Sequence, residues 1–311
     1  MPLEAIKSTI SEHLDSTPEG RIPLILIIGP TAVGKTELSI GIAKAFDGEV
    51  ISADSRQVYK GMDIGTDKIT LEEMDGVPHH MLDMVEPDEE FTVYDFKKEC
   101  NRLIPEISAR GHMPFIVGGT MLYSDAVVKN FDFAGVKPNP EIRKELEGIL
   151  EREGKEFLYK KLQELDPEAA KNIHPNNTYY VMRAIEKILN KDAKNPEPKP
   201  HNYHVLKIGL IRPREELYSR INTRVEQQLK DGKLEAEAKE MIEKYGENER
   251  SITGLGYRQF IPYFNGDTKL DGTSYTLEDV KSHLQKETRN FAKRQLSWWR
   301  KDKDIHWFEV G

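Results

Sequence analysis

The segment GPTAVGKT, from Gly29 to Thr36, constrains the fold more than any other part of the chain. It matches the pattern G-x-x-x-x-G-K-[ST]. The continuous apolar run IPLILIIG precedes it, and apolar residues at helical spacing follow it at Leu38, Ile42 and Ala45. Such an apolar run is typical of a strand buried on both faces of a parallel sheet. Between a strand and a helix, the two glycines allow backbone N–H groups to converge on phosphate oxygens at the positive end of the helix. The pattern therefore predicts a phosphate-binding loop, or P-loop.

Within this loop, we expect Lys35 to neutralise phosphate charge and the Thr36 hydroxyl to bind Mg²⁺. The strand–loop–helix context disfavours the alternative of an ordinary glycine turn. The residues predicted to bind phosphate are Gly29, Pro30, Thr31, Ala32, Gly34, Lys35 and Thr36. The motif does not choose a reaction by itself, because kinases, ATPases and GTPases all use it.

Strand-like and helical segments alternate along the rest of the chain. The other predicted strands are EVISADS, PFIVGGT, KIGLI and IHWFEV. Their alternation with helices predicts an α/β fold with a doubly wound parallel sheet. Between about 133 and 200 the sequence is helical and highly charged, and the proline-rich NPEPKPHN closes it. We expect an N-terminal helical extension (1–20), a P-loop core (21–132 and 201–311) and an all-helical insertion (133–200).

Composition narrows the class of protein. The chain has 311 residues, 38% of them hydrophobic and 32% charged, which fits a soluble globular protein. No run approaches the roughly 18 apolar residues of a membrane span, and the first twenty residues lack the apolar core of a signal peptide. The single cysteine, Cys100, cannot form an internal disulfide, which favours the cytoplasm and a buried, inert thiol. We expect the chain to act as a monomer.

A basic segment lies near the C-terminus. The net charge of −8 argues weakly against a nucleic-acid partner. However, KSHLQKETRNFAKRQLSWWRKDK, from Lys281 to Lys303, carries eight lysines and arginines against only Glu287 and Asp302. Its two interpretations are a solvated helix face and a surface that binds nucleic acid.

Asp54 lies at the end of the predicted strand EVISADS. Side chains at the carboxyl end of a buried parallel strand lie where α/β proteins bind ligands, beside the P-loop in this case. There a carboxylate can coordinate Mg²⁺ through water or act as a general base. An aspartate before a serine also commonly caps a turn, and spacing alone leaves these alternatives open.

Seven motifs resemble, in this order, those of the tRNA dimethylallyltransferases (tRNA isopentenyltransferases). They are GPTAVGKT, DSRQVYKGMDIGTDK, GVPHHMLD, VGGTMLY, IHPNN, GLGYRQ and AKRQLSWWR. The resemblance runs from about Leu24 to Trp307. It implies transfer of the dimethylallyl group of dimethylallyl diphosphate to N6 of adenine 37, next to the anticodon of a tRNA.

The resemblance also implies roles for individual residues. Asp54 would accept the proton of the adenine amino group. Thr120 would hydrogen-bond to the diphosphate, and Arg220 would reach it from across the channel. The implied tRNA contacts are Ser55, Arg56, Gln57, Arg183, Gly256, Tyr257, Arg258, Lys293, Arg294, Gln295, Trp298 and Arg300. Of the adjacent tryptophans, we expect one to stack on a base and the other to lie in the core.

Two features qualify this interpretation. Tyr179 and Tyr180 stand where family members usually carry a polar-basic pair, which affects how the insertion contacts the anticodon stem. The adjacent His79 and His80 point to opposite sides of an extended segment, which disfavours a metal site.

Three other functions remain open. They are an adenylate isopentenyltransferase that acts on free AMP, ADP or ATP, a P-loop small-molecule kinase, and a non-catalytic RNA-binding protein. The long helical insertion and the basic segment favour a macromolecular acceptor.

Overall fold

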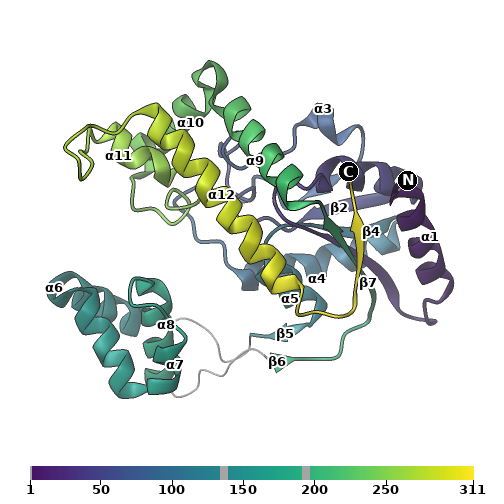
Figure 1. Cartoon of the computed structure of the whole chain (residues 1–311). Helices are drawn as coiled ribbons and strands as arrows, with labels where there is room; N and C mark the ends of the chain where they lie inside the picture. Colours follow the sequence, from purple (N-terminus) through teal and green to yellow (C-terminus); the bar gives the residue numbers. More distant parts are fainter. Residues whose placement is uncertain (1, 134–138, 191–196) are drawn as a thin grey trace. The chain divides into compact units, whose positions relative to one another are not determined.

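The computed structural model describes residues 2–133, 139–190 and 197–311 (Figure 1). It forms two compact units. The core unit contains Met1–Val128 and His201–Gly311, and the insertion unit contains Lys129–Pro200. Within the described part of the chain, every helix is too short or too polar to cross a membrane.

A six-stranded parallel sheet organises the core unit, with the strand order β3-β2-β4-β1-β7-β8. The strands are β1 (Ile22–Ile28), β2 (Gly48–Ser52), β3 (His79–His80), β4 (Met113–Gly118), β7 (Tyr203–Ile211) and β8 (Ile305–Glu309). The predicted parallel α/β fold is thus confirmed. β3 was not predicted, because its two residues are too few to show a pattern.

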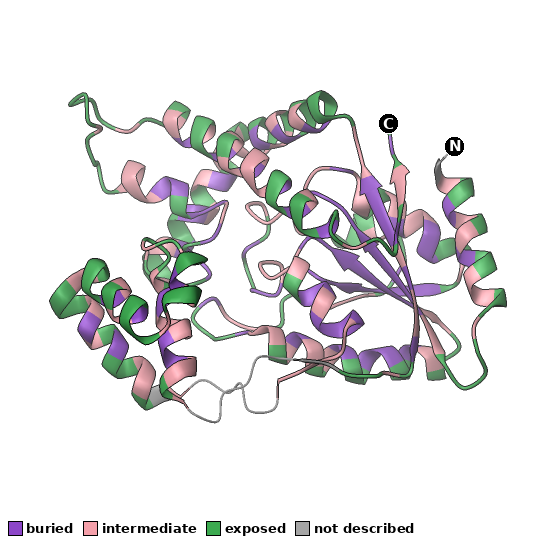
Figure 2. Ribbon diagram, turned by 60° about the horizontal axis from the view of Figure 1, so that its bottom comes forward, coloured by how far each residue is buried: buried purple, intermediate pink, exposed green. Residues whose placement is uncertain are grey.

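Helices cover both faces of this sheet (Figure 2). The longer helices of the core unit are α1 (Pro2–Asp15), α2 (Lys35–Ala45), α4 (Val93–Ala109), α5 (Met121–Val128), α9 (Arg214–Leu229), α10 (Lys233–Tyr245) and α12 (Leu277–Trp299). The short ones are α3 (Leu71–Met74), η1 (Lys230–Gly232), η2 (Arg258–Phe260) and α11 (Ile261–Phe264).

Alternate side chains of β1 supply two separate cores. Leu24, Leu26 and Ile28 pack in the cluster that includes residues of α4, α5, α10 and α12. Ile25 and Ile27 pack in the other cluster, with residues of α1, α2 and α9. Successive residues of a strand point to opposite faces, so a strand covered on both sides must be apolar throughout.

Cys100 is fully buried in α4, as predicted. Burial raises the pKa of its thiol well above the ordinary range, because the interior disfavours the thiolate. The structure thus agrees with an inert thiol.

Glycines allow close approach at the carboxyl ends of the strands. A Cβ on Gly29 would lie 2.8 Å from the carbonyl oxygen of Leu210, and one on Gly118 would lie 2.2 Å from that of Ala53. Both obstacles are backbone atoms of neighbouring segments. The junctions after β1 and β4 therefore require glycine.

The insertion unit has a core of its own. Its helices are α6 (Pro140–Leu165), which is kinked at Gly154, α7 (Pro167–Lys171) and α8 (Thr178–Leu189). They enclose an apolar cluster that includes Leu146, Leu158 and Ile185. The unit also contains an antiparallel pair, β5 (Phe131–Asp132) with β6 (Glu197–Pro198), so it is not purely helical. This pair was not predicted, because each strand has only two residues.

We expect Gly118→Ala to lower the free energy of unfolding by about 1–3 kcal/mol, the usual cost of overpacking. The added methyl group would overlap the backbone of Ala53. Gly41→Ala in α2 is the control: a Cβ there meets nothing within 4 Å, and removing a glycine from a helix should stabilise the protein slightly. Denaturant unfolding measures both changes. A Gly118→Ala protein as stable as the wild type would contradict the close approach.

Candidate functional site

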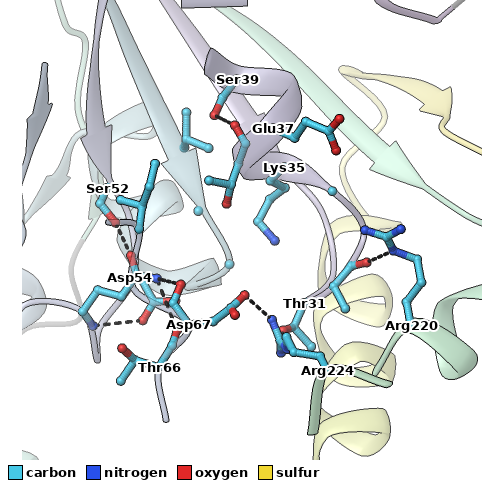
Figure 3. Close-up of a pocket in the computed structure, with 18 of the residues that line it drawn as sticks. Thr31, Lys35, Glu37, Ser39, Ser52, Asp54, Thr66, Asp67, Arg220 and Arg224 are labelled. Atoms are coloured by element: carbon cyan, nitrogen blue, oxygen red, sulfur yellow. Dashed lines mark hydrogen bonds and ion pairs between the residues drawn. The ribbon is translucent and has the colours of Figure 1, made fainter. Parts of the chain in front are cut away.

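A cavity of about 510 Å³ lies in the core unit beside the P-loop. Its lining comes from the P-loop and α2, from the segments after β2 and β4, and from α9 and α12. Figure 3 shows Lys35, Asp54, Asp67 and Arg224 around this space. The fold therefore gathers cationic, acidic and hydroxyl side chains at the carboxyl ends of the strands, as expected for a parallel sheet.

Lys35 is the first residue of α2, directly after Gly34, which has a left-handed backbone with φ 106°. Its ammonium group donates hydrogen bonds to the carbonyl oxygens of Gly29 at 2.9 Å and Pro30 at 3.0 Å. Burial, assisted by the positive charge of Arg224, lowers the pKa of Lys35 to about 8, although Asp54 and Asp67 oppose this shift. The site thus places a cation in partly desolvated surroundings, where an added anion would stabilise its charged form.

Thr36, the second residue of α2, is exposed and lines the same cavity as Asp54. A hydroxyl, a carboxylate and the oxygens of a bound phosphate are donors that suit a hard cation such as Mg²⁺. In residues 2–133, 139–190 and 197–311, no three His, Cys, Asp or Glu side chains are grouped to hold a metal by themselves.

Asp54 uses one carboxylate oxygen to hold its own turn. Oδ1 accepts hydrogen bonds from the backbone N–H groups of Arg56 at 2.8 Å and Gln57 at 3.4 Å. Within the described residues, Oδ2 has no hydrogen bond, and the side chain lines the cavity. The turn-capping interpretation is therefore correct, and it leaves the second oxygen available for a base.

Thr120 supports the same turn from the segment after β4. Its Oγ1 accepts a hydrogen bond from the backbone N–H of Ser55 at 2.9 Å and donates to the Ser55 Oγ at 3.3 Å. Neither residue lines the cavity directly. The predicted diphosphate contact of Thr120 and tRNA contact of Ser55 remain proposals.

Two arginines reach the P-loop from α9. Nε of Arg220 donates to the carbonyl oxygen of Ala32 at 2.9 Å. One turn later, Arg224 bonds to Asp67 at 2.8 Å and to the hydroxyl of Thr31. Neither Arg224 nor Asp67 was predicted as a site residue from the sequence. Since residues four apart lie on one face of a helix, the spacing from Arg220 could have indicated Arg224.

Gln295 is placed differently from its prediction as a tRNA contact. Its side chain is 1% exposed. Oε1 accepts from the backbone N–H of Thr31 at 2.9 Å, and Nε2 donates to the carbonyl oxygen of Gly119 at 2.8 Å. This buried amide links the P-loop to the segment after β4 and lines the cavity, so its side chain does not lie on the exposed surface of α12.

Tyr257 is likewise a core residue. It is fully buried, and its hydroxyl donates to Oε1 of Glu237 at 2.7 Å. Gly256, with φ 111°, is also buried. A Cβ on it would lie 2.7 Å from the carbonyl oxygen of Gly65. The structure therefore assigns this pair to packing, in contrast to the predicted RNA contact.

The side chains of Arg56 and Gln57 are held within the core unit. Arg56 donates to the carbonyl oxygens of Arg250 at 2.7 Å and Ser251 at 3.2 Å. Burial lowers the pKa of Arg56. Gln57 bonds to Ser52 and to the backbone of the segment that ends at Asp67. Both residues thus fix the loops around Asp54.

The remaining predicted tRNA contacts of the core unit are exposed. They are Arg258, Lys293, Arg294, Trp298 and Arg300. Trp298 is 41% exposed and donates through Nε1 to Asp125 at 2.9 Å, whereas Trp299 is 2% exposed. The prediction that one tryptophan of the pair lies in the core is confirmed, and Trp298 keeps an accessible ring.

In the insertion unit, Arg183 forms an ion pair with the buried Glu186 at 2.8 Å. The neighbouring rings of Tyr179 and Tyr180 are 42% and 62% exposed. Aromatic rings, not basic groups, therefore extend from this part of α8.

The two adjacent histidines have different partners. His79 Nδ1 bonds to the carbonyl oxygen of Val77 at 2.9 Å, and its side chain lines the cavity. His80 bonds through Nε2 to Glu49 at 2.6 Å.

We expect Gln295→Leu to lower the free energy of unfolding by about 1–3 kcal/mol, because it leaves the partly buried N–H of Thr31 and the buried carbonyl oxygen of Gly119 without these partners. Since Thr31 would lose its support, the affinity for inorganic diphosphate should fall as well. Gln285→Leu on the same helix is the control, because its amide makes only a long contact of 3.4 Å with Glu226. Equal stability and diphosphate affinity in both variants would show that the link is unimportant.

Comparison with known proteins agrees with this geometry. The IPP transferase family matches residues 57–302. The chain is 43% identical over 293 residues to a tRNA dimethylallyltransferase of Halalkalibacterium halodurans, which covers 92% of this chain and 91% of the relative. It is 42% identical over 294 residues to one of Bacillus subtilis, covering 93% and 91% of the two chains.

Solved structures show the same relationship. A full-length tRNA isopentenylpyrophosphate transferase from Bacillus halodurans matches with a TM-score of 0.68 and 44% identity, over 92% of this chain and 89% of that one. A eukaryotic dimethylallyltransferase described as acting on tRNA matches with a TM-score of 0.69 and 28% identity, over 93% and 74% of the two chains. These matches confirm the fold class and the family resemblance predicted from the sequence.

Proposed function

Because this chain belongs to the IPP transferase family, we propose that it transfers the dimethylallyl group of dimethylallyl diphosphate to N6 of adenine 37 in tRNA. One observation carries the proposal. The P-loop with its lysine, two arginines of α9 and the carboxylate of Asp54 surround a single cavity. Such a cavity can hold a diphosphate at one side and a base near the nucleophile at the other.

In the proposed reaction, the bond between C1 of the dimethylallyl group and a diphosphate oxygen breaks, and a bond between C1 and N6 forms. The diphosphate leaves with the bonding electrons, so its developing charge must be stabilised. Lys35, the P-loop N–H groups and Arg220 are the groups of this chain that do so. The phosphorus–oxygen bonds stay intact, which distinguishes this use of a P-loop from that of a kinase.

The amino proton of adenine passes to Oδ2 of Asp54. An adenine amino group is a poor nucleophile because its lone pair is delocalised into the ring, so alignment must contribute much of the rate. Hydrogen bonds to the other oxygen, Oδ1, fix the carboxylate. Thr120 steadies the same turn through Ser55.

Mg²⁺ is the proposed metal, with the Thr36 hydroxyl as its protein ligand. When bound, the ion neutralises charge on the departing diphosphate. Thr36 and the diphosphate oxygens together form the hard-oxygen environment that Mg²⁺ prefers.

The proposed tRNA surface combines the exposed basic residues of α12 with Trp298. Lys293 and Arg294 can contact phosphates, and the accessible ring of Trp298 can stack on an unpaired base. Arg183 and the exposed tyrosines of α8 are the proposed contacts of the insertion unit. We further propose that the protein works as a monomer in the cytoplasm.

The direct test offers radiolabelled dimethylallyl diphosphate and Mg²⁺ in parallel to an anticodon stem-loop carrying A36-A37-A38 and to free AMP. We expect label in the RNA alone. Label in AMP would instead assign the protein to the adenylate isopentenyltransferases, and phosphoryl transfer from ATP without prenyl transfer would indicate a kinase.

We expect Asp54→Asn to lower kcat by about two orders of magnitude or more, the usual scale for loss of a general base, while tRNA affinity stays nearly unchanged. Asparagine keeps the Oδ1 acceptor that holds the turn but takes up no proton. Single-turnover kinetics and filter binding separate the two effects. A variant with normal turnover and weakened tRNA binding would contradict the base role.

We expect tRNA binding to weaken steeply with salt, and Lys293→Ala and Arg300→Ala each to reduce the salt slope by about 1. Both side chains are exposed near the end of α12. Lys7→Ala on α1, where the lysine pairs with Glu4, is the control. Binding that does not respond to salt would exclude an electrostatic role for α12.

A further inference from the structure

The guanidinium of Arg224 lies between the P-loop and an acid of another loop (Figure 3). Nη1 donates to Oδ2 of Asp67 at 2.8 Å, and Nη2 bonds to the hydroxyl of Thr31. Nε is buried and has no hydrogen-bond partner within the described residues. All three residues line the cavity beside Lys35. Arg224 therefore lies at the phosphate-binding loop with a counter-ion already bound.

The loop that carries Asp67 is held firmly. Glu237 accepts hydrogen bonds from three of its backbone N–H groups, those of Asp63 at 3.1 Å, Ile64 at 2.8 Å and Gly65 at 2.9 Å. Gln57 donates to the carbonyl oxygen of Asp67 itself at 3.1 Å. Because both sides of the loop are fixed, the carboxylate of Asp67 is kept within reach of Arg224.

Asp67 is an acid at a site that is proposed to bind an anion. A diphosphate carries several negative charges, and a carboxylate beside it is repelled. Asp67 is 52% exposed at its side chain, whereas Arg224 is 22% exposed. The acid can therefore move into water when an anion arrives, and the arginine remains at the P-loop with its donors available.

We propose that Asp67 is a latch for Arg224: it holds the guanidinium beside Thr31 until the diphosphate displaces its carboxylate, and it competes for the guanidinium again when the product leaves. Asp67 is thus a positioning residue, and Arg224 is a second arginine for the diphosphate. The proposal rests on the proposed function only in that the cavity binds a diphosphate.

The latch should lower the affinity of the site for diphosphate. Breaking the ion pair between Arg224 and Asp67 costs free energy. This cost offsets part of the attraction between Arg224 and the diphosphate, so the acid weakens binding. Removing its charge should tighten binding of inorganic diphosphate by about fivefold, at the lower end of couplings between sites. For the full reaction, the KM for dimethylallyl diphosphate should fall, and kcat should fall as well wherever release of diphosphate limits turnover.

The test is a double-mutant cycle in the full-length chain, read out as calorimetric binding of inorganic diphosphate with and without Mg²⁺. The variants are Asp67→Asn, Arg224→Gln and the combination of both. Asp67 has φ 56°, a left-handed conformation that asparagine also tolerates, so Asp67→Asn keeps the backbone of the loop. Asp63→Asn is the matched control, because this acid of the same loop pairs with Lys68 and not with Arg224.

We expect Asp67→Asn to bind diphosphate about fivefold more tightly, Arg224→Gln to bind more weakly, and the double variant to match Arg224→Gln alone. Asp63→Asn should bind like the wild type. Unchanged or weaker binding by Asp67→Asn would overturn the latch, and weaker binding only with Mg²⁺ would make Asp67 a metal ligand instead. Strictly additive effects would also overturn it, since Asp67 would then not act through Arg224.

This measurement is independent of the transferase assay. Neither tRNA nor a prenyl group is present, so a failure to prenylate RNA would refute the proposed function and leave the coupling between Asp67 and Arg224 standing. Normal prenylation without that coupling would refute the latch alone.

Discussion

The register of three neighbouring strands determines which loops meet at the cavity. β1 pairs with β4 through Ile28 and Gly118, and with β7 through Ile28 and Gly209, so all three strands end at the same edge of the sheet. The P-loop leaves β1 at that edge, and the segment that carries Thr120 leaves β4 beside it. Glycines at both junctions allow backbones to approach where any side chain would collide. A shift of one residue would invert the faces of the strand and separate these loops.

Around the cavity, the cationic side chains and the proposed base lie on different segments. Lys35, Arg220 and Arg224 approach the P-loop, whereas Asp54 stands on the turn after β2. The division suits a reaction in which a strongly anionic group departs and a weakly acidic amino group is deprotonated. Because the backbone and buried amides position these groups, little reorganisation is needed during the reaction.

The sequence predicted the parallel sheet, the P-loop and the position of Asp54, because each depends on local patterns: an apolar run, glycine spacing and the end of a strand. Asp67 was not predicted as a site residue, since its pairing with Arg224 joins segments that lie 157 residues apart. Tertiary contacts of this kind have no local signature.

Gln295 was misjudged for a different reason. Its place in AKRQLSWWR, a motif that resembles one of the tRNA dimethylallyltransferases, implied an RNA contact. However, Thr288, Ala292, Gln295 and Trp299 are all buried on α12. Their spacing of three and four residues marks the inward face of a helix, and this signal outweighs the charge of adjacent residues. The same periodicity explains why Trp298 is accessible and Trp299 is not.

In the proposed reaction, this P-loop holds a diphosphate that leaves whole. The most direct test of this proposal is a single turnover with dimethylallyl diphosphate and an anticodon stem-loop, in which the inorganic diphosphate released is counted against the prenyl groups bound to RNA. We expect equal amounts of the two products and no inorganic monophosphate. Monophosphate release, or phosphate attached to the RNA, would contradict the proposal.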